Sequence, residues 1–411
     1  MVIISKFSGI SLTVLLLGVD AAKLIPFEAP KEDLIPNSYI VVMKDEVTKL
    51  DFNSHVAWAT NLHHEILSKR GATSFAGMKF TYDVNGWLGY SGNFDEETLQ
   101  EILDNPNVNY VEQDRIVRAS VLPKTLNKRE ETVQRNAPAW GLGRISHKKG
   151  GSRDFVYDDT AGEGVTVYGV DSGIDVNHPD FGGRATWGHN AVDRQNNDGY
   201  GHGTHTAGTI ASTTYGVAKK ASVVAVKVLD ANGHGSESGI IQGINWATQH
   251  AQQNGHTGKA VINLSLGAPN SNALNDVASR AVQAGIFVTV ASGNDNRDAS
   301  NYTPASARGV CTAAASSQGD TKASFSNFGP VIAVYAPGDQ ILSIEPNGRT
   351  GTRSGTSMAS PHIAGVAAAL IASENADIAS LCSRIKQLAG EAIRNPGSRT
   401  TGKLLYNNSG K

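Results

Sequence analysis

From Trp140 to the C-terminus, short apolar runs alternate with segments that have helical spacing. The runs are nearly continuous and rich in β-branched residues, which is typical of parallel strands buried on both faces. They lie at residues 165–170, 223–229, 261–266 and 286–290. The helical segments at 238–252 and 273–284 are long enough for right-handed crossovers. This pattern predicts an α/β fold with a mostly parallel, doubly wound sheet flanked by helices, in which functional sites gather where strands end.

A smaller unit of different character precedes this sheet. Its expected elements are a strand at 38–43, a helix at 52–67, strands and turns over 71–92, a helix at 95–103 and a strand at 107–112. The helix at 95–103 begins with acidic residues, which the helix dipole favours at that end. A β-α-β-β-α-β order of this length predicts a compact, ferredoxin-like α+β domain with its core over residues 37–112.

Residues 1–21 have the features of a secretory signal. Lys6 precedes an apolar run over residues 10–19, and small residues follow, so cleavage is expected after Ala21. The run is too short to span a bilayer, and we therefore expect a secreted, extracellular protein that acts on no membrane. The formal net charge of -2 gives no long-range attraction to nucleic acid.

The segment over residues 119–135 is polar and contains the dibasic pair Lys128-Arg129. We interpret it as an exposed processing linker between an N-terminal region at 22–118 and a C-terminal domain at 136–411. Proteolytic cleavage is expected between about Arg118 and Arg129. An ordinary surface loop remains an alternative interpretation of the dibasic pair.

Side chains with complementary chemistry stand at the predicted ends of strands and helices. Asp171 ends the first strand, His202 lies in a glycine loop that enters an Ala-rich helix, and Ser357 begins a buried Ala-rich helix. A hydroxyl activated by an imidazole that a carboxylate orients is the minimum set for nucleophilic catalysis. Asn294 follows another strand, and its amide could donate to an oxyanion. Singly, these residues are also typical of turns, loops and helix caps, but their joint occurrence indicates catalysis.

The stretches around these residues resemble those of subtilisin-like serine proteases, closest to the secreted fungal branch that includes proteinase K. Asp, His and Ser also follow one another in the order typical of subtilisin. The resemblance covers the chain from about residue 136 to the end, and residues 37–112 are similar to the inhibitory propeptide of the family. The matching stretches are Val170-Asp171-Ser172-Gly173-Ile174, His202-Gly203-Thr204-His205, Leu264-Ser265-Leu266-Gly267, Ala291-Ser292-Gly293-Asn294 and Gly355-Thr356-Ser357-Met358-Ala359-Ser360-Pro361-His362.

This resemblance implies an endopeptidase of broad specificity that forms an acyl-enzyme and is made as an autoinhibited zymogen. Ser357 would be the nucleophile, His202 the general base and acid, and Asp171 the group that orients the imidazole. Asn294 and the Ser357 N–H would form the oxyanion hole. Protein and peptide substrates would bind along a strand edge, with aromatic or aliphatic side chains in the main pocket. The implied substrate-binding residues are Ser265, Leu266, Gly267, Ala291, Ser292, Gly293 and Gly233.

The chain departs from the family pattern at two positions. Glu237, near His234, stands where proteinase-K-like members often carry a tyrosine that covers a more distant pocket, which leaves the preference of that pocket open. Ala333 stands at the position of a calcium-binding aspartate. Because calcium needs carboxylate oxygens, we expect no calcium at that position and no required cofactor, while other calcium sites stay open.

Cys311 and Cys382 are the two cysteines of the chain. An even pair suggests one disulfide in an oxidising compartment, and these positions match one disulfide of the resembled branch. Asn301 and Asn407 begin glycosylation sequons in polar surroundings, whereas Asn263 begins one in a buried strand, where we expect no glycan. We expect a monomer whose partners are its substrates and its own propeptide.

Two functions from other classes are alternatives. A catalytically silent binding protein on the same scaffold would have no need for Asp171, His202 and Ser357 together. A lipase or esterase with a serine triad would carry a Gly-x-Ser-x-Gly turn, which this chain lacks, and a different residue order.

Overall fold

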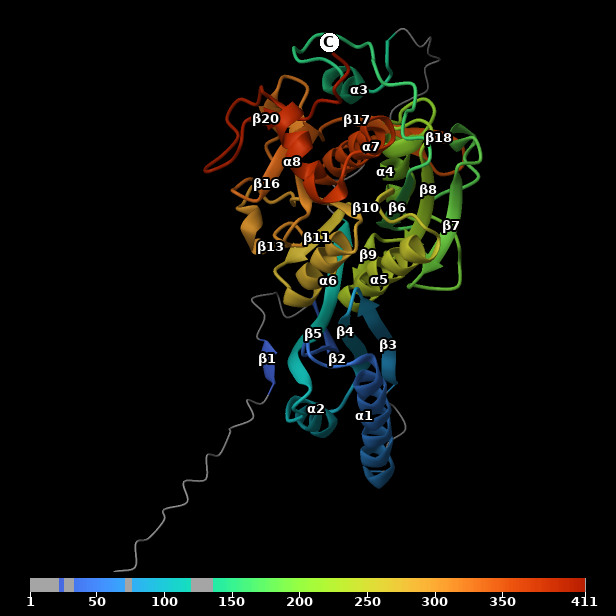
Figure 1. The fold of residues 1–411 in the computed structure, drawn as a ribbon, viewed down its shortest axis with the longest axis vertical. Coiled ribbons are helices and arrows are strands. Elements are labelled where there is room, and N and C mark those ends of the chain that lie inside the picture. The colour runs from blue at the N-terminus through green and yellow to red at the C-terminus, as the bar shows by residue number, and fades with distance from the viewer. Residues whose placement is uncertain (1–21, 26–32, 71–75, 120–135, 411) are drawn as a thin grey trace, which may run out of the picture.

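The computed structural model describes residues 22–25, 33–70, 76–119 and 136–410. The predicted signal at 1–21 and residues 120–135 of the predicted linker lie outside the described residues. A small N-terminal domain, blue to cyan in Figure 1, lies against one side of a larger C-terminal domain, green to red.

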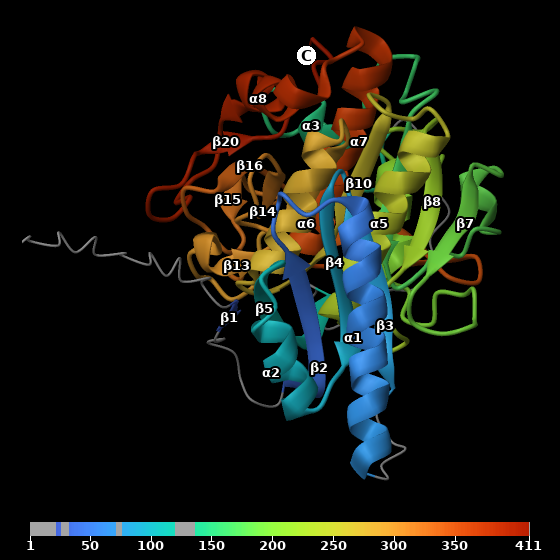
Figure 2. The same ribbon diagram turned by 60° about the horizontal axis from the view of Figure 1, so that its bottom comes forward.

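The N-terminal domain has the predicted β-α-β-β-α-β order. Strands β2 to β5 form an antiparallel sheet in the order β5-β2-β4-β3, β1 pairs with β5 in parallel, and Figure 2 shows α1 and α2 on the outer face of this sheet. Asp95 caps α2 by accepting a hydrogen bond from the Thr98 N–H at 2.9 Å. The elements are β1 (Lys23–Ile25), β2 (Leu34–Met43), α1 (Lys49–Arg70), β3 (Gly77–Val84), β4 (Trp87–Asn93), α2 (Glu96–Leu103) and β5 (Val108–Ala119).

Strand β5 is longer than predicted and reaches Ala119, one residue into the predicted linker. Its last residues pair with β9 (His234–Ser236) and β11 (Leu266–Pro269) of the C-terminal domain. The extension is therefore held by partners that lie far away along the sequence, and no local pattern indicates it.

The C-terminal domain contains the predicted parallel sheet. Its neighbouring strands from β20 to β7 run parallel in the order β20-β16-β14-β12-β10-β6-β8-β7. The predicted strand at 261–266 is divided, because β10 ends at Leu264 and β11 begins at Leu266. The strands are β6 (Thr166–Asp171), β7 (Ala185–Asn190), β8 (Ser222–Lys227), β10 (Ala260–Leu264), β12 (Phe287–Ala291), β13 (Tyr302–Thr303), β14 (Cys311–Ser317), β15 (Thr321–Lys322), β16 (Ile332–Pro337), β17 (Ile341–Glu345), β18 (Arg349–Arg353), β19 (Gly390–Glu391) and β20 (Lys403–Leu404).

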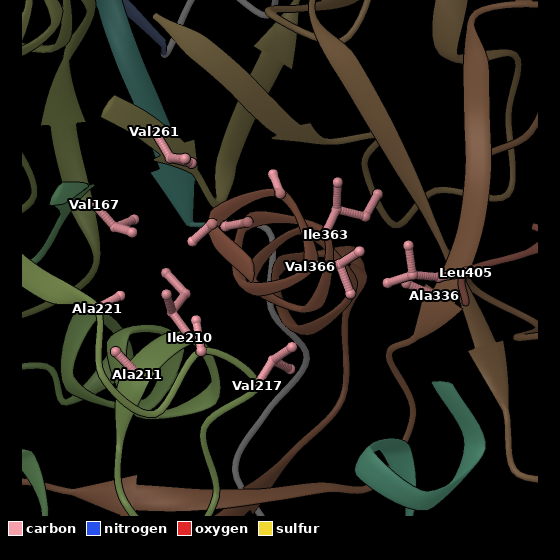
Figure 3. Packing of buried hydrophobic residues seen from close by; sticks show 14 of the residues in the cluster. Val167, Ile210, Ala211, Val217, Ala221, Val261, Ala336, Ile363, Val366 and Leu405 are labelled. Carbon is pink, nitrogen blue, oxygen red and sulfur yellow. The ribbon is translucent and has the colours of Figure 1, made fainter. Parts of the chain in front are cut away.

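Helices cover both faces of this sheet. On one face, α7 is buried in a core that Figure 3 shows on both sides of the helix, with Ala336 and Leu405 toward Ile363 and Val366, and with Val261 of the sheet and Ile210 of α4 on the opposite side. On the other face, α5 and α6 lie between the sheet and the N-terminal domain. The helices are α3 (Trp140–Ile145), α4 (His202–Ala211), α5 (Glu237–Gln253), α6 (Asn272–Gln283), α7 (Thr356–Glu374) and α8 (Ile378–Leu388).

Several smaller predictions concern this domain. Cys311 of β14 and Cys382 of α8 form a disulfide with their Cα atoms 5.6 Å apart, which confirms the predicted pair. Asn263 is fully buried in β10, and Ala333 is buried in β16. Within the described part of the chain, no single helix has the length and apolar character needed to cross a membrane.

Candidate active site

Asp171 and His202 form a buried pair at the edge of the parallel sheet. Asp171 is the last residue of β6, His202 is the first residue of α4, and the Asp171 Oδ1 lies 2.7 Å from the His202 Nδ1. Both side chains are fully buried. The start of α4 approaches the chain after β6 so closely that a Cβ at Gly203 would lie 2.0 Å from the Gly173 carbonyl oxygen. Glycine at this position therefore permits the imidazole to reach the carboxylate.

A second carboxylate, Asp198, holds the loop that leads into α4. It accepts hydrogen bonds from the Ser172 hydroxyl at 2.8 Å, the Gly201 N–H at 2.7 Å and the Thr204 N–H at 2.8 Å. Burial raises the pKa of Asp198, and these hydrogen bonds oppose the rise. The sequence analysis did not identify Asp198. Its position just before the glycine loop was the only available signal.

Ser357 is the second residue of α7. Gly355 is the N-cap and no side chain caps this helix, so the alternative interpretation of Ser357 as a capping serine is wrong. The Ser357 hydroxyl donates to the Ser265 carbonyl at 2.8 Å, and the Ser265 hydroxyl donates to the Ser357 carbonyl at 2.8 Å. The His202 Nε2 has no hydrogen-bond partner among the described residues.

Asn294 is held in one orientation by Thr356. The Asn294 Oδ1 accepts hydrogen bonds from the Thr356 N–H at 2.8 Å and from the Thr356 hydroxyl at 3.0 Å. Because the oxygen is occupied on this side, the amide nitrogen is directed away from Thr356. Thr356 is a positioning residue that the sequence analysis missed, although it stands inside the motif around Ser357.

The four predicted residues converge at one edge of the sheet. Strands β6, β10 and β12 are neighbours, and parallel strands end at the same edge. Asp171 ends β6, and Asn294 follows β12. Ser357 is hydrogen-bonded to Ser265, which lies just beyond β10. Helices α4 and α7, which begin at His202 and Thr356, pack against each other. Asp171 and His202 meet at the start of α4, and Ser357 and Asn294 lie at the start of α7, so both pairs stand at the positively polarised end of a buried helix.

The last residues of β5 occupy the groove beside this edge. Arg118 pairs with Gly267 of β11 and with His234 of β9, and Ala119 pairs with Leu266. The Ala119 N–H donates to the Gly233 carbonyl at 3.0 Å. Of the predicted substrate-binding residues, Leu266, Gly267 and Gly233 therefore contact the N-terminal domain of the same chain, as β5 in Figure 1 indicates.

A cavity of about 390 Å³ opens next to these strands. On the C-terminal domain it is lined by residues that include Ala291, Ser292, Gly293, Gly267 and Asn294, and on the N-terminal domain by Asp33, Ile116, Arg118 and Ala119. Ser265 does not line this cavity, and its contact with Ser357 is the one described above.

Two acidic residues of β5 bind the starts of α5 and α6. Glu112 accepts hydrogen bonds from the Asn272 N–H at 3.0 Å and the Ala273 N–H at 3.2 Å. Asp114 accepts hydrogen bonds from the Ser238 N–H at 3.0 Å and the Ser238 hydroxyl at 2.6 Å. Carboxylates at helix N-termini satisfy N–H groups that have no partner within the helix. Neither residue was predicted, because acidic residues within a strand give no sign of a partner in another domain.

Glu112 also shares a hydroxyl with Glu237, the first residue of α5. The Ser271 hydroxyl lies 2.8 Å from the Glu112 carboxylate and also contacts the Glu237 carboxylate. One hydroxyl proton cannot serve two carboxylates, so this contact favours a proton on one of them. Burial, and then the charge of Glu237, raise the pKa of Glu112 from its ordinary value of 4.5 to about 7, against the opposing hydrogen bonds.

Comparison with known proteins agrees with this arrangement. Residues 162–396 match the model of the subtilase family, and residues 38–120 match that of the peptidase inhibitor I9 family. A subtilisin-like protease of Coccidioides posadasii (strain C735) is 55% identical over 398 residues, covering 96% of each chain. Subtilisin-like protease 4 of Trichophyton tonsurans is 58% identical over 379 residues, covering 92% of each chain.

A solved structure, that of a cold adapted subtilisin-like serine proteinase, superimposes with a TM-score of 0.62 at 40% identity. The match covers 65% of this chain and 97% of that chain. The fold, the edge at which the polar side chains meet and these relatives all lead to one conclusion. The chain belongs to the subtilase family of serine proteases and carries an I9-type inhibitor domain as its propeptide.

Proposed function

We propose that this subtilisin-like protease is a secreted endopeptidase of broad specificity, with Ser357 as nucleophile, His202 as general base and acid, and Asp171 as the group that orients the imidazole. The observation that carries the proposal is the contact of 2.7 Å between Asp171 and His202 at the sheet edge where Ser357 is held. A serine-directed organophosphonate together with casein tests it. We expect Ser357 to be labelled and casein to be hydrolysed. If Ser357 stays unlabelled and casein stays intact, the result would favour a binding protein.

The proposed reaction needs only these side chains. When the Ser357 hydroxyl leaves the Ser265 carbonyl and turns to His202, its oxygen attacks the substrate carbonyl carbon while the His202 Nε2 takes the proton. The C–N bond then breaks, and His202 returns the proton to the leaving amine, which leaves an acyl ester on Ser357. Water attacks the ester by the same route, with His202 again taking and returning a proton. Asp171 holds the Nδ1 proton throughout, which keeps Nε2 free to accept.

The oxyanion that forms in this attack would be bound by the Asn294 amide and the Ser357 N–H. We expect Asn294→Ala to lower kcat by about 10²–10³-fold, the range known for removal of one such donor in subtilisin, with little change in KM. The reason is that the amide nitrogen, directed away from Thr356, would meet charge that develops only in the transition state. Steady-state kinetics on a chromogenic peptide measure both constants. A rise in KM at constant kcat would instead assign Asn294 to ground-state binding.

The main pocket is proposed to take aromatic or aliphatic side chains before the scissile bond. Its walls at Ala291, Ser292 and Gly293 carry little side-chain bulk, which leaves room for a large apolar group. A peptide-library cleavage profile of the mature enzyme tests this preference. Selection of acidic or basic residues in this pocket would contradict it.

Secretion and processing complete the proposal. The signal at 1–21 would be removed after Ala21, and the chain would be cut in the 119–135 linker, which N-terminal sequencing of the secreted protein can locate. Asn301 is exposed and suited to carry a glycan. At Asn407, the Nδ2 to which a glycan would attach donates to the Val156 carbonyl at 2.7 Å, so glycosylation there requires the loss of this hydrogen bond.

We also propose that catalysis proceeds without a resident metal ion, by a monomeric enzyme. Ala333 offers a methyl group where the family pattern places a calcium-binding aspartate, and the described residues hold no group of three His, Cys, Asp or Glu side chains suited to a metal. Activity is expected to survive dialysis against a chelator. Loss of activity that calcium restores would contradict this part of the proposal.

The cleaved propeptide is expected to bind less tightly as the pH rises from about 5 to about 7, and then to bind with constant affinity. Because the pKa of Glu112 is raised to about 7 in the complex, association takes up a proton between its ordinary pKa of 4.5 and that value. Protonation of Glu112 stabilises the complex fully below its ordinary pKa of 4.5, and this stabilisation is lost as the pH rises through its pKa of about 7 in the complex. One proton allows a change of at most about tenfold per pH unit.

The dissociation constant of the cleaved, noncovalent complex, measured across this range, checks the expectation. Glu112→Gln provides the matched control, because an amide still accepts hydrogen bonds from the start of α6 but does not titrate. The same pH dependence in both proteins would show that another group takes up the proton.

A further inference from the structure

The register of β5 places one basic side chain of the propeptide opposite Glu237. Ile116 pairs with Ser236, Val117 with Gly235 and Arg118 with His234, in an antiparallel ladder between β5 and β9. The next position along the ladder brings Arg115 opposite Glu237, which follows β9 directly and begins α5. Any peptide strand bound in this register presents the corresponding residue, four positions before that of Ala119, to the same carboxylate.

Arg115 and Glu237 form an ion pair that is shielded from water. The Arg115 Nε lies 2.5 Å from the Glu237 Oε2, and the two side chains are 1% and 0% exposed. The other Glu237 oxygen contacts the Ser271 hydroxyl at the start of α6. Arg115 is the one basic side chain of the described residues that forms an ion pair with Glu237.

The two partners separate when the propeptide leaves. Glu237 and Ser271 belong to the C-terminal domain, whereas Arg115 departs with β5. Glu237 then stays at the end of the groove between β9 and β11, with the Ser271 hydroxyl on one side and without the cation that Arg115 supplies. A carboxylate at the edge of a low-dielectric groove is stabilised by a cation that is held there, and it disfavours an anion.

We propose that Glu237, supported by Ser271, forms an acidic subsite that selects substrates with arginine or lysine at the position of Arg115. This inference rests on the proposed endopeptidase function and adds a charge preference to it. The backbone ladder binds peptides of many sequences, because main-chain hydrogen bonds do not depend on side chains. Glu237 adds discrimination at one position of this ladder. This charge preference is also our answer for the more distant pocket, whose preference the sequence left open because Glu237 stands where related enzymes often carry a tyrosine.

A peptide series based on residues 114–124 of the chain tests the proposal. The residue that corresponds to Arg115 is kept, or is replaced with Lys, Gln or Glu, and mass spectrometry establishes that all peptides are cut at the same bond. For the mature enzyme, kcat/KM is expected to be about fivefold to fiftyfold higher with Arg or Lys than with Gln, and lower still with Glu. The preference is expected to shrink at high salt, which screens charge pairs.

Variants of Glu237 identify the group responsible. In Glu237→Gln the ratio of kcat/KM between the Arg and Gln peptides is expected to fall to about one, and in Glu237→Arg the Glu peptide becomes the better substrate. Glu163→Gln, which removes an exposed carboxylate that pairs with Lys220, serves as the matched control and keeps the wild-type ratio. If Glu237→Gln fails to mature, the double variant Arg115→Gln/Glu237→Gln has a propeptide interface without either charge and is used in its place.

A shortened peptide that begins at the position of Ile116 separates this inference from the proposed function. Wild-type enzyme that cuts the shortened peptide, but cuts the Arg and Gln peptides equally well, overturns the acidic subsite and leaves the endopeptidase function in place. Enzyme that cuts none of the peptides contradicts the endopeptidase function itself. An unchanged preference for Arg in Glu237→Gln also overturns the proposal, because Glu237 would then serve only to stabilise the start of α5.

Discussion

Replacement of Ser357 with alanine is expected to lower kcat for peptide hydrolysis by about 10⁶-fold, the loss known for removal of the nucleophile in subtilisin itself. The alanine variant keeps the helix α7, because its N-cap is Gly355 and the hydroxyl contributes a hydrogen bond to the Ser265 carbonyl rather than a cap. What is lost is the atom that would carry the acyl group. The precursor is also expected to stay uncut, so intact mass measurement should find the propeptide still covalently attached.

Ser373→Ala is the matched control for this variant. Ser373 lies in the same helix, is exposed, and donates to the Ala369 carbonyl at 2.8 Å, so its loss should leave kcat within about twofold of wild type. A Ser357→Ala protein that still hydrolyses casein at more than about one hundredth of the wild-type rate would exclude Ser357 as the nucleophile.

The fold could be predicted where a local sequence pattern arises from a single structural feature, such as burial of a strand on both faces. The strands β6, β8, β10 and β12 are buried on both faces, so each is a nearly continuous apolar run that stands out from the helices between them. The end of β5 could not be predicted in this way. Residues 113–119 include Asp114, Arg115 and Arg118, and their partners in the C-terminal domain belong to β9, β11 and the start of α5.

The same distinction applies to the active site. The placement of Asp171, His202, Ser357 and Asn294 at one sheet edge could be predicted, because each stands at or just beyond the end of a strand, or at the start of a helix, inside a short motif. Their supporting residues were not. Asp198 and Thr356 hold neighbouring loops in place through hydrogen bonds. Glu112 binds the start of α6, which lies more than a hundred residues further along the chain. A motif records which groups carry chemistry, whereas positioning depends on contacts that only the fold creates.

Asp171→Asn is expected to lower kcat by about 10⁴-fold, as the equivalent change does in another serine protease triad, while KM changes little. Asparagine has nearly the shape of aspartate, but the Asp171 Oδ1 both accepts from the Ser172 N–H and contacts the His202 Nδ1, each at 2.7 Å, so an amide nitrogen placed there gives up the hydrogen bond from Ser172. Its amide presents a donor as well as an acceptor toward the His202 Nδ1. If the amide donates, the imidazole proton moves to Nε2, and His202 can no longer accept the proton of Ser357.

Asp175→Asn is the control, because Asp175 follows the same strand but accepts a hydrogen bond from the Asn347 N–H at 2.9 Å instead of contacting His202. Active-site titration corrects both variants for misfolded enzyme, and the remaining kcat ratio then reports the state of the imidazole alone. If Asp171→Asn kept more than about a tenth of the wild-type kcat, the carboxylate would have no role in setting the proton on His202. The contact of 2.7 Å between them would then be structural, and the proposed mechanism would lack its orienting group.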